Sequence, residues 1–305
     1  MSEPQPFVSV CLLTYKRADV LGRSLDSLLA QTHTNFELII NDDKSPDETE
    51  RIGRDYERRD SRVRYFKNAK NLRYAGNQNA AVDRARSEFV AIVHDGDIYR
   101  RDLIECWVKA LVTHPTAALV FNSVEVMDLC GRTVVVDRQS YAPLIPGLQL
   151  LEEMLQSPGS PIFGIVMLRK SCLQAVGPFD TTLPTLADVD MWMRLLARYD
   201  AAYISEPLLK VAAREINHHN RPNNWAVRAE HERIYQLNLA RSEGRNCPAT
   251  AARHRRVARM LWRLRVWSIL WCAKELKLKS FLAGLRFCCR GPLTSAGASS
   301  GIIKQ

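Results

Sequence analysis

The chain has 305 residues, of which 46% are hydrophobic and 25% are charged, and its formal net charge is +10. These ordinary globular proportions exclude a collagen-like, low-complexity or disordered chain, and the length allows one large or two modest domains. No apolar run reaches the roughly 18 residues of a membrane span, and the N-terminus lacks the basic start of a signal peptide.

The predicted elements of the first half alternate between strands and helices. Apolar runs predict strands at Phe7–Thr14, Phe36–Ile40, Val63–Phe66, Phe89–Val93 and Ala117–Phe121. Amphipathic or charged segments predict helices at Asp19–Ala30, Pro46–Arg59, Ala75–Arg86 and Asp102–Thr113. This alternation is typical of an α/β fold with a doubly wound, mostly parallel sheet flanked by helices.

Beyond Cys130 the pattern is less regular. We expect strands at Pro161–Leu168, Ala202–Ile204 and Leu208–Ala212, and helices at Leu150–Leu155, Ala187–Arg198 and Trp225–Leu239. The stretch Glu215–Asn224 is predicted to be a polar loop and Ser242–Pro248 a linker. A helical pattern returns at Ala249, and the Ser/Gly/Ala-rich end is expected to be disordered.

The positive charge is concentrated at the C-terminal end. Residues 241–305 contain 14 Lys and Arg against 2 Asp and Glu, a net of +12, whereas residues 1–240 carry −2. We therefore predict a catalytic domain over residues 1–240 and a basic, amphipathic helical extension over residues 241–305. Eight cysteines lack metal-ligand spacing, which favours free thiols in a reducing cytoplasm.

Three polar clusters follow predicted strands: residues 14–17, 41–43 and 95–97. The carboxyl ends of parallel strands share one edge, where ligands bind in such sheets. Asp95 and Asp97, separated by one glycine, supply the hard oxygen ligands that Mg²⁺ or Mn²⁺ prefers, often together with substrate phosphates. The alternative is a turn with two solvated carboxylates.

Other polar residues are weaker candidates. Asp42 suits a hydrogen bond to a nucleobase, unless it caps the next helix. Asp188, near the start of a predicted helix, suits a general base, with capping again the alternative. Arg214 suits pairing with a diphosphate, and His218 or His219 suits a place in a metal shell, unless these side chains are merely solvated.

Three segments together resemble the family 2 glycosyltransferases of the GT-A fold. They are FVSVCLLTYKRADVLGRSLDSLLAQTHTNFELIINDDKSPDET, NLRYAGNQNAAVDRARSEFVAIVHDGDIY and VGPFDTTLPTLADVDMWMRL, within residues 7–220. The resemblance implies a metal-dependent, inverting transfer of a sugar from a nucleoside diphosphate donor to a glycan or lipid-linked acceptor. A nucleotide-sugar-binding protein without turnover is the alternative.

The resemblance also implies a role for individual residues. Asp97 would hold the metal, Asp95 would approach the ribose, and Asp188 would be the catalytic base. The implied donor-binding residues are Thr14, Tyr15, Arg17, Asn79 and Asp42, the last reading the base, uracil in this interpretation.

Three features depart from the family's usual pattern: Lys44 replaces a glycine, Ala187 replaces a glutamate, and HDGDIY is less acidic than usual. Lys44 puts base or phosphate contacts in doubt, and Ala187 the handling of the acceptor.

The basic extension combines arginines with Trp262, Trp267 and Trp271. Such helices lie on anionic membrane surfaces, so we expect peripheral contact with the inner face of the cell membrane. The alternative is a helix packed on the catalytic domain. No zinc finger or RNA-binding motif occurs, so no nucleic acid partner is expected.

Overall fold

The computed structural model describes residues 5–128, 131–137, 139–156, 160–212, 225–243 and 251–274. Internal contacts divide the chain into two units, Met1–Glu215 and Ile216–Gln305. The division falls before the boundary predicted after residue 240. It places helix α8 (Trp225–Glu243) with α9 (Ala251–Lys274) in the second unit.

The first unit contains an eight-stranded sheet with the order β3-β2-β1-β4-β10-β6-β11-β9. Its strands are β1 (Val8–Thr14), β2 (Phe36–Asp42), β3 (Val63–Lys67), β4 (Phe89–His94), β6 (Ala117–Asn122), β9 (Leu144–Ile145), β10 (Val166–Arg169) and β11 (Asp200–Ile204). Strands β1 to β4 pair in parallel, as the apolar runs predicted. Strand β10 runs antiparallel to β4 and β6, so the sheet is mixed rather than uniformly wound.

A second, four-stranded sheet was not predicted. It consists of β5 (Ile98–Tyr99), β12 (Leu209–Ala212), β7 (Val124–Met127) and β8 (Thr133–Asp137). Strand β5 follows the Asp95–Asp97 turn directly, and β12 pairs with it antiparallel. The second sheet therefore brings residue 212 to the turn that carries the two carboxylates.

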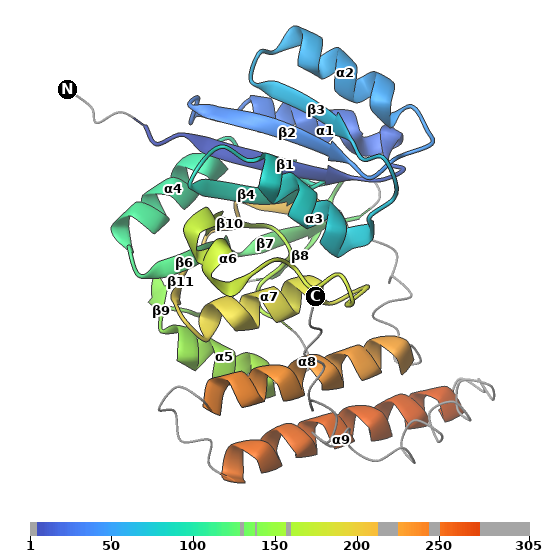
Figure 1. The fold of residues 1–305 in the computed structure, drawn as a ribbon, viewed down its shortest axis with the longest axis vertical. Helices are drawn as coiled ribbons and strands as arrows, with labels where there is room; N and C mark the ends of the chain where they lie inside the picture. The colour runs from blue at the N-terminus through green and yellow to red at the C-terminus, as the bar shows by residue number, and fades with distance from the viewer. Residues whose placement is uncertain are drawn as a thin grey trace, which may run out of the picture. The chain divides into compact units, whose positions relative to one another are not determined.

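Helices cover both faces of the large sheet. They are α1 (Ala18–Leu29), α2 (Thr49–Arg59), α3 (Arg73–Arg84), α4 (Leu103–Thr113), α5 (Gly147–Gln156), α6 (Lys170–Val176) and α7 (Ala187–Leu196). Figure 1 shows α3, α6 and α7 in front of the sheet and α1 behind it. The apolar faces of α1 and α4 and one face of the strands bury a core that includes Leu12, Leu25, Ile40 and Trp107. This core fixes the carboxyl ends of β1, β2 and β4 in place.

A buried carboxylate connects three strands near the amino end of β2. Glu37 on β2 accepts hydrogen bonds from Ser9 Oγ (2.7 Å), Arg64 Nη1 (2.6 Å) and Arg86 Nη2 (2.7 Å). Burial alone opposes ionisation, but the hydrogen bonds from Arg86, Ser9 and Arg64 outweigh it and lower the pKa of Glu37 to about 2.

Replacing Glu37 by Gln should lower the free energy of unfolding by about 3 kcal/mol at pH 7, since each pKa unit corresponds to about 1.4 kcal/mol. A depressed folded-state pKa stabilises the protein fully above the ordinary value of 4.5, and that stabilisation disappears as the pH falls toward 2. Urea denaturation from pH 7 to pH 3 should therefore show the two proteins converging. Glu48→Gln, at an exposed surface pair, is the control and should change stability little; a pH-independent difference would contradict the assignment.

Candidate active site

The three polar clusters meet at the predicted edge of the sheet. The N–H of Asp43 donates to the carbonyl of Thr14 (3.0 Å), and the N–H of Asp95 lies 3.3 Å from the carbonyl oxygen of Leu13. Thr14 is opposite Asp42 in the register of β1 and β2, and Leu13 is opposite His94 in that of β1 and β4. The convergence inferred from the order of strands and helices is thus confirmed.

Asp42 is fully buried and both of its carboxylate oxygens are engaged. Oδ1 accepts the N–H of Ser45 (2.8 Å), and Oδ2 accepts the hydroxyl of Tyr65 (2.6 Å). Asp43 uses only Oδ1, which accepts from Asn68 Nδ2 (3.0 Å) and from the N–H of Leu72 (2.7 Å). Asp42 is thus engaged within the protein, whereas Asp43 keeps one oxygen without a partner in the described chain.

Lys44 occupies a left-handed backbone conformation, with φ of 64°. Glycine adopts this conformation without the steric cost that a side chain incurs. Lys44 therefore adopts the backbone conformation that a glycine at this position favours, and its exposed side chain points away from the core. Ala187, the other departure, is fully buried at the start of α7.

Two arginines surround the glycine between Asp95 and Asp97. Gly96 has φ of 84°, and a Cβ at this position would lie 2.8 Å from Nη2 of Arg17. Arg23 Nε donates to the carbonyl of Gly96 (3.1 Å). Arg17 is half-buried, and its guanidinium makes no hydrogen bond or ion pair within the described residues, so its charge is available to an anion beside the turn.

Asp97 faces the second sheet. Its Oδ1 accepts the N–H of Ala212 (3.0 Å), and the side chain is nearly buried, as is Asp95. The described residues contain no group of three or more His, Cys, Asp or Glu able to hold a metal ion. Two hard carboxylates on one turn nevertheless fit a divalent cation that is held partly by a substrate diphosphate, because Mg²⁺ usually binds in this shared way.

The predicted base Asp188 lies in the first turn of α7 and is partly exposed. Its Oδ1 accepts the N–H of Val189 (2.8 Å), and its Oδ2 lies 3.3 Å from the hydroxyl of Tyr74, which also lies 3.4 Å from His94 Nε2. Tyr74 can orient the carboxylate by donating a hydrogen bond to Oδ2. An ionised carboxylate held in this way can accept a proton from a hydroxyl.

The lack of a side chain at Gly164 lets Tyr74, His94 and Asp188 lie close to its backbone. A Cβ at Gly164 would lie 2.7 Å from Tyr74 Oη, 2.9 Å from His94 Cε1 and 3.2 Å from Asp188 Oδ2. Four segments of the chain therefore meet at one point. Sequence reasoning missed Tyr74, His94 and Gly164, although His94 directly precedes Asp95 and Gly164 interrupts an apolar run.

Asn79 does not point an open amide at a nucleotide. Its Nδ2 donates to the carbonyl of Phe179 (2.9 Å), and its Oδ1 accepts the N–H of Phe179 (2.8 Å). Arg194 pairs with Asp190 (2.8 Å) and donates to the carbonyl of Pro178 (2.8 Å). Asn79 and Arg194 thus hold the segment that leads into α7 and Asp188, which is a positioning role.

The remaining predicted site residues differ in accessibility. Tyr15 is exposed, with Lys16 Nζ 5.4 Å from the centre of its ring. The hydroxyl of Thr14 is buried and has no hydrogen-bond partner among the described residues. Arg214, His218 and His219 lie outside the described residues.

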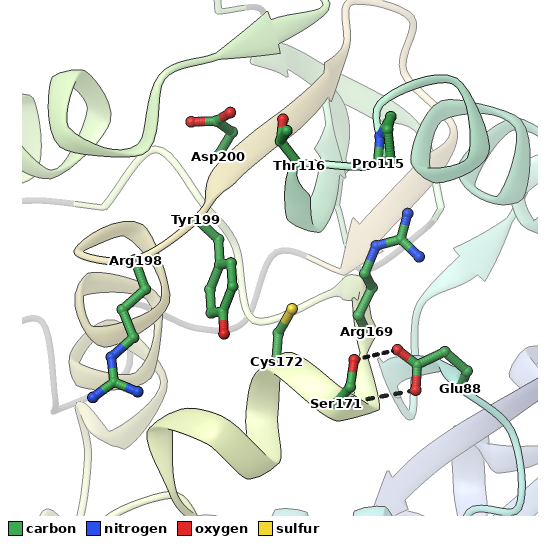
Figure 2. Close-up of a pocket in the computed structure, with 9 residues that line it drawn as sticks. All are labelled: Glu88, Pro115, Thr116, Arg169, Ser171, Cys172, Arg198, Tyr199 and Asp200. Atoms are coloured by element: carbon green, nitrogen blue, oxygen red, sulfur yellow. Dashed lines mark hydrogen bonds between the residues drawn. The ribbon is translucent and has the colours of Figure 1, made fainter.

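A cavity of about 620 Å³ lies elsewhere on the sheet (Figure 2). Its lining includes Glu88, Thr116 and Asp200, which precede or begin β4, β6 and β11. These are the amino ends of the strands, so the cavity is at the edge opposite the aspartate clusters. The N–H of Ser171 donates to Glu88 Oε2 there (3.2 Å). Cys172 is nearly buried, and burial raises the pKa of its thiol.

Two solved structures of other proteins share this architecture. S. aureus TarS 1–349 in complex with UDP superposes with a TM-score of 0.63 and 18% identity, over 83% of this chain and 70% of TarS. The mannosyltransferase PcManGT from Pyrobaculum calidifontis, in complex with GDP-Man and Mn²⁺, gives a TM-score of 0.58 and 17% identity, over 95% of this chain and 76% of its own. Both similarities support the GT-A fold.

Sequence comparison gives the family. The putative glycosyltransferase EpsE of Bacillus subtilis is 28% identical over 68% of this chain and 73% of its own length. The putative teichuronic acid biosynthesis glycosyltransferase TuaG of the same organism is 26% identical over 74% and 85%. The sequence model of the family described as glycosyl transferase family 2 matches residues 9–176, more than half of the chain. The chain therefore belongs to glycosyl transferase family 2 and is an inverting glycosyltransferase.

Proposed function

We propose that this enzyme transfers a sugar from a UDP-linked donor to a hydroxyl of a glycan or lipid-linked acceptor. The observation that supports this most is the meeting of Asp188, Tyr74 and His94 beside the Asp95–Asp97 turn. The turn suits a diphosphate, and the three side chains suit an attacking hydroxyl. TarS binds UDP and UDP-GlcNAc in its solved complexes, whereas PcManGT binds GDP-Man.

The donor would lie along the carboxyl ends of β1, β2 and β4. We assign base recognition to Asp43 in place of Asp42, because Asp43 Oδ2 is free to accept an N–H of the base. Thr14 and Tyr15 would line the nucleotide pocket, and Asp95 would approach the ribose. Arg17 would neutralise part of the diphosphate, since its guanidinium has no partner in the described chain.

Asp97, with Asp95 beside it, would hold Mn²⁺ or Mg²⁺ together with the diphosphate. When bound, such a cation stabilises negative charge on the departing diphosphate. Arg214 stays a predicted contact of the diphosphate, and His218 and His219 stay predicted metal ligands.

Asp188 would remove the proton of the acceptor hydroxyl as its oxygen attacks the anomeric carbon. Attack opposite the leaving group in a single displacement inverts the configuration there. Tyr74 would orient Asp188 by donating its hydroxyl proton to Oδ2. A lipid-linked acceptor would place this reaction at a membrane surface, which the basic C-terminal region of the chain suits.

The test is thermal stability with UDP, GDP, CDP or dTDP, each with and without Mn²⁺. A ligand at 100 times its Kd stabilises the folded state by about 2.7 kcal/mol, which raises the Tm by a few degrees. We expect UDP to give the largest shift, Mn²⁺ to increase it, and Asp43→Ala to reduce it.

Asp83→Asn, an exposed change on α3, is the matched control and should shift as the wild type does. A selective response to GDP would overturn the UDP assignment, and no response to any nucleotide would overturn the donor site. Equal shifts with and without Mn²⁺ would overturn the role given to the metal.

A further inference from the structure

The C-terminal unit contains a helix with a clearly defined inner side. Glu232 on α8 forms an ion pair with Arg265 on α9, and both side chains are largely buried. Val257 and Ser268 are buried on the same side of α9. This side therefore packs against α8, and it sets which residues of α9 lie on the opposite side.

That opposite side carries an unusual set of residues for a solvent-facing helix. Trp262, Trp267 and Leu270 are 64%, 52% and 62% exposed, far more than large apolar residues of a packed helix. Four arginines are exposed on the same side, so we call these seven residues the α9 outer face: Arg255, Arg256, Arg259, Trp262, Arg263, Trp267 and Leu270.

The two kinds of residue are arranged in order along the helix. The arginines are concentrated between residues 255 and 263, and the apolar side chains between 262 and 270. At 1.5 Å per residue the outer face is about 22 Å long. The helix as a whole has six arginines, one lysine and no acidic residue, so no charge on it opposes an anionic partner.

We propose that the α9 outer face docks on the surface of an anionic phospholipid bilayer. The arginines would pair with lipid phosphates, and Trp262, Trp267 and Leu270 would enter the boundary between head groups and acyl chains. Among the described residues no helix is long and apolar enough to cross a membrane. A bilayer is favoured over another polyanion because the exposed apolar side chains gain most from leaving water there.

This docking deepens the proposed use of a lipid-linked acceptor, but it does not depend on the donor or on transfer. Vesicle binding is measured without nucleotide, and nucleotide binding without vesicles. Failure of one leaves the other intact.

The test is co-sedimentation of the full chain with vesicles of phosphatidylcholine alone or mixed with phosphatidylglycerol. We expect at least tenfold stronger binding to the anionic vesicles, weakening as salt rises. The double variant Trp262→Ser, Trp267→Ser and the triple variant Arg255→Gln, Arg259→Gln, Arg263→Gln should each lose most of this binding.

The matched control is the triple variant Arg51→Gln, Arg54→Gln, Arg58→Gln, which removes three exposed arginines from α2. It should bind vesicles as the wild type does. An equal loss in this control would reduce the effect to net charge and overturn the assignment to α9.

Two further measurements distinguish the bilayer from other binding partners of the α9 outer face. Light scattering that shows a dimer, lost in the tryptophan variant, together with no vesicle binding, would make the face an interface between copies of the chain. Binding to an oligonucleotide but not to anionic vesicles at the same salt would make the partner a nucleic acid. Either result would overturn the proposal.

Discussion

Replacing Asp188 by Asn should lower the kcat of sugar transfer by about 10³-fold while leaving the Kd of the nucleoside diphosphate unchanged. General bases contribute roughly 10²–10⁴-fold, and Asn keeps the shape of the side chain but cannot take the proton. Asp188 lies on α7 and is not among the residues assigned to the diphosphate, so binding of the diphosphate should not change. Release of nucleoside diphosphate from the selected donor, in the presence of acceptor, measures kcat.

Tyr74→Phe separates orientation from proton transfer. It removes the hydroxyl 3.3 Å from Asp188 Oδ2 but keeps the carboxylate, so we expect a loss of about tenfold and an upward shift of the acidic limb of the pH profile. Asp83→Asn on α3 is the charge-matched control for Asp188→Asn and should transfer normally. Activity of Asp188→Asn within about threefold of the wild type would place the base elsewhere, given the minimum contribution expected of a base.

The carboxyl edge of the sheet was predictable because its strands are buried on both faces. β1 and β2 are buried at every position, and such strands appear in a sequence as continuous apolar runs. Once the runs are located, parallel pairing brings the polar residues after them together. The clusters at Thr14, Asp43 and Asp95 followed from that logic without any knowledge of side-chain contacts.

Our proposal that Asp43 rather than Asp42 recognises the base could not be made from the sequence. The two residues are adjacent and both lie at the end of one strand, so spacing treats them alike. What separates them is the hydroxyl of Tyr65 on β3, which occupies Asp42 Oδ2. A partner 23 residues away in the chain, brought close by strand pairing, is not visible in the sequence.

The second sheet escaped prediction for a different reason. Strand β8 exposes Val134, Val135 and Val136, so its apolar run does not alternate between a buried and a solvated face. Strand β5 has only two residues. Neither gives the periodic signal by which strands are recognised, although pairing with β5 is what brings Ala212 to Asp97.

Strand β10 was predicted to begin at Pro161 but begins at Val166, and the difference concerns the site itself. Gly164 lies in the irregular segment that precedes the strand, where its backbone approaches Tyr74, His94 and Asp188. A glycine inside an apolar run often marks a close approach of the backbone to another group. The sequence contained that signal, but only the structure names the groups.

Replacing Gly164 by Ala should therefore lower kcat by about 10²-fold with little change in stability or in the Kd of the nucleoside diphosphate. The new methyl would lie 2.7 Å from Tyr74 Oη and 3.2 Å from Asp188 Oδ2, closer than such contacts allow. Both are ends of side chains, which can move aside without disturbing the core. A displacement of roughly 1 Å at reacting groups can cost about 10²-fold in rate.

Gly22→Ala, within α1, is the matched control. Its new Cβ would contact only Tyr56 Oη, at an ordinary distance of 3.6 Å. It should leave transfer unchanged. Tyr74→Phe combined with Gly164→Ala removes the closest contact, so the double variant should be no slower than Gly164→Ala alone. Additive losses would mean that Gly164 acts on catalysis by another route, whereas a non-additive result would show that Gly164 acts by letting Tyr74 reach Asp188.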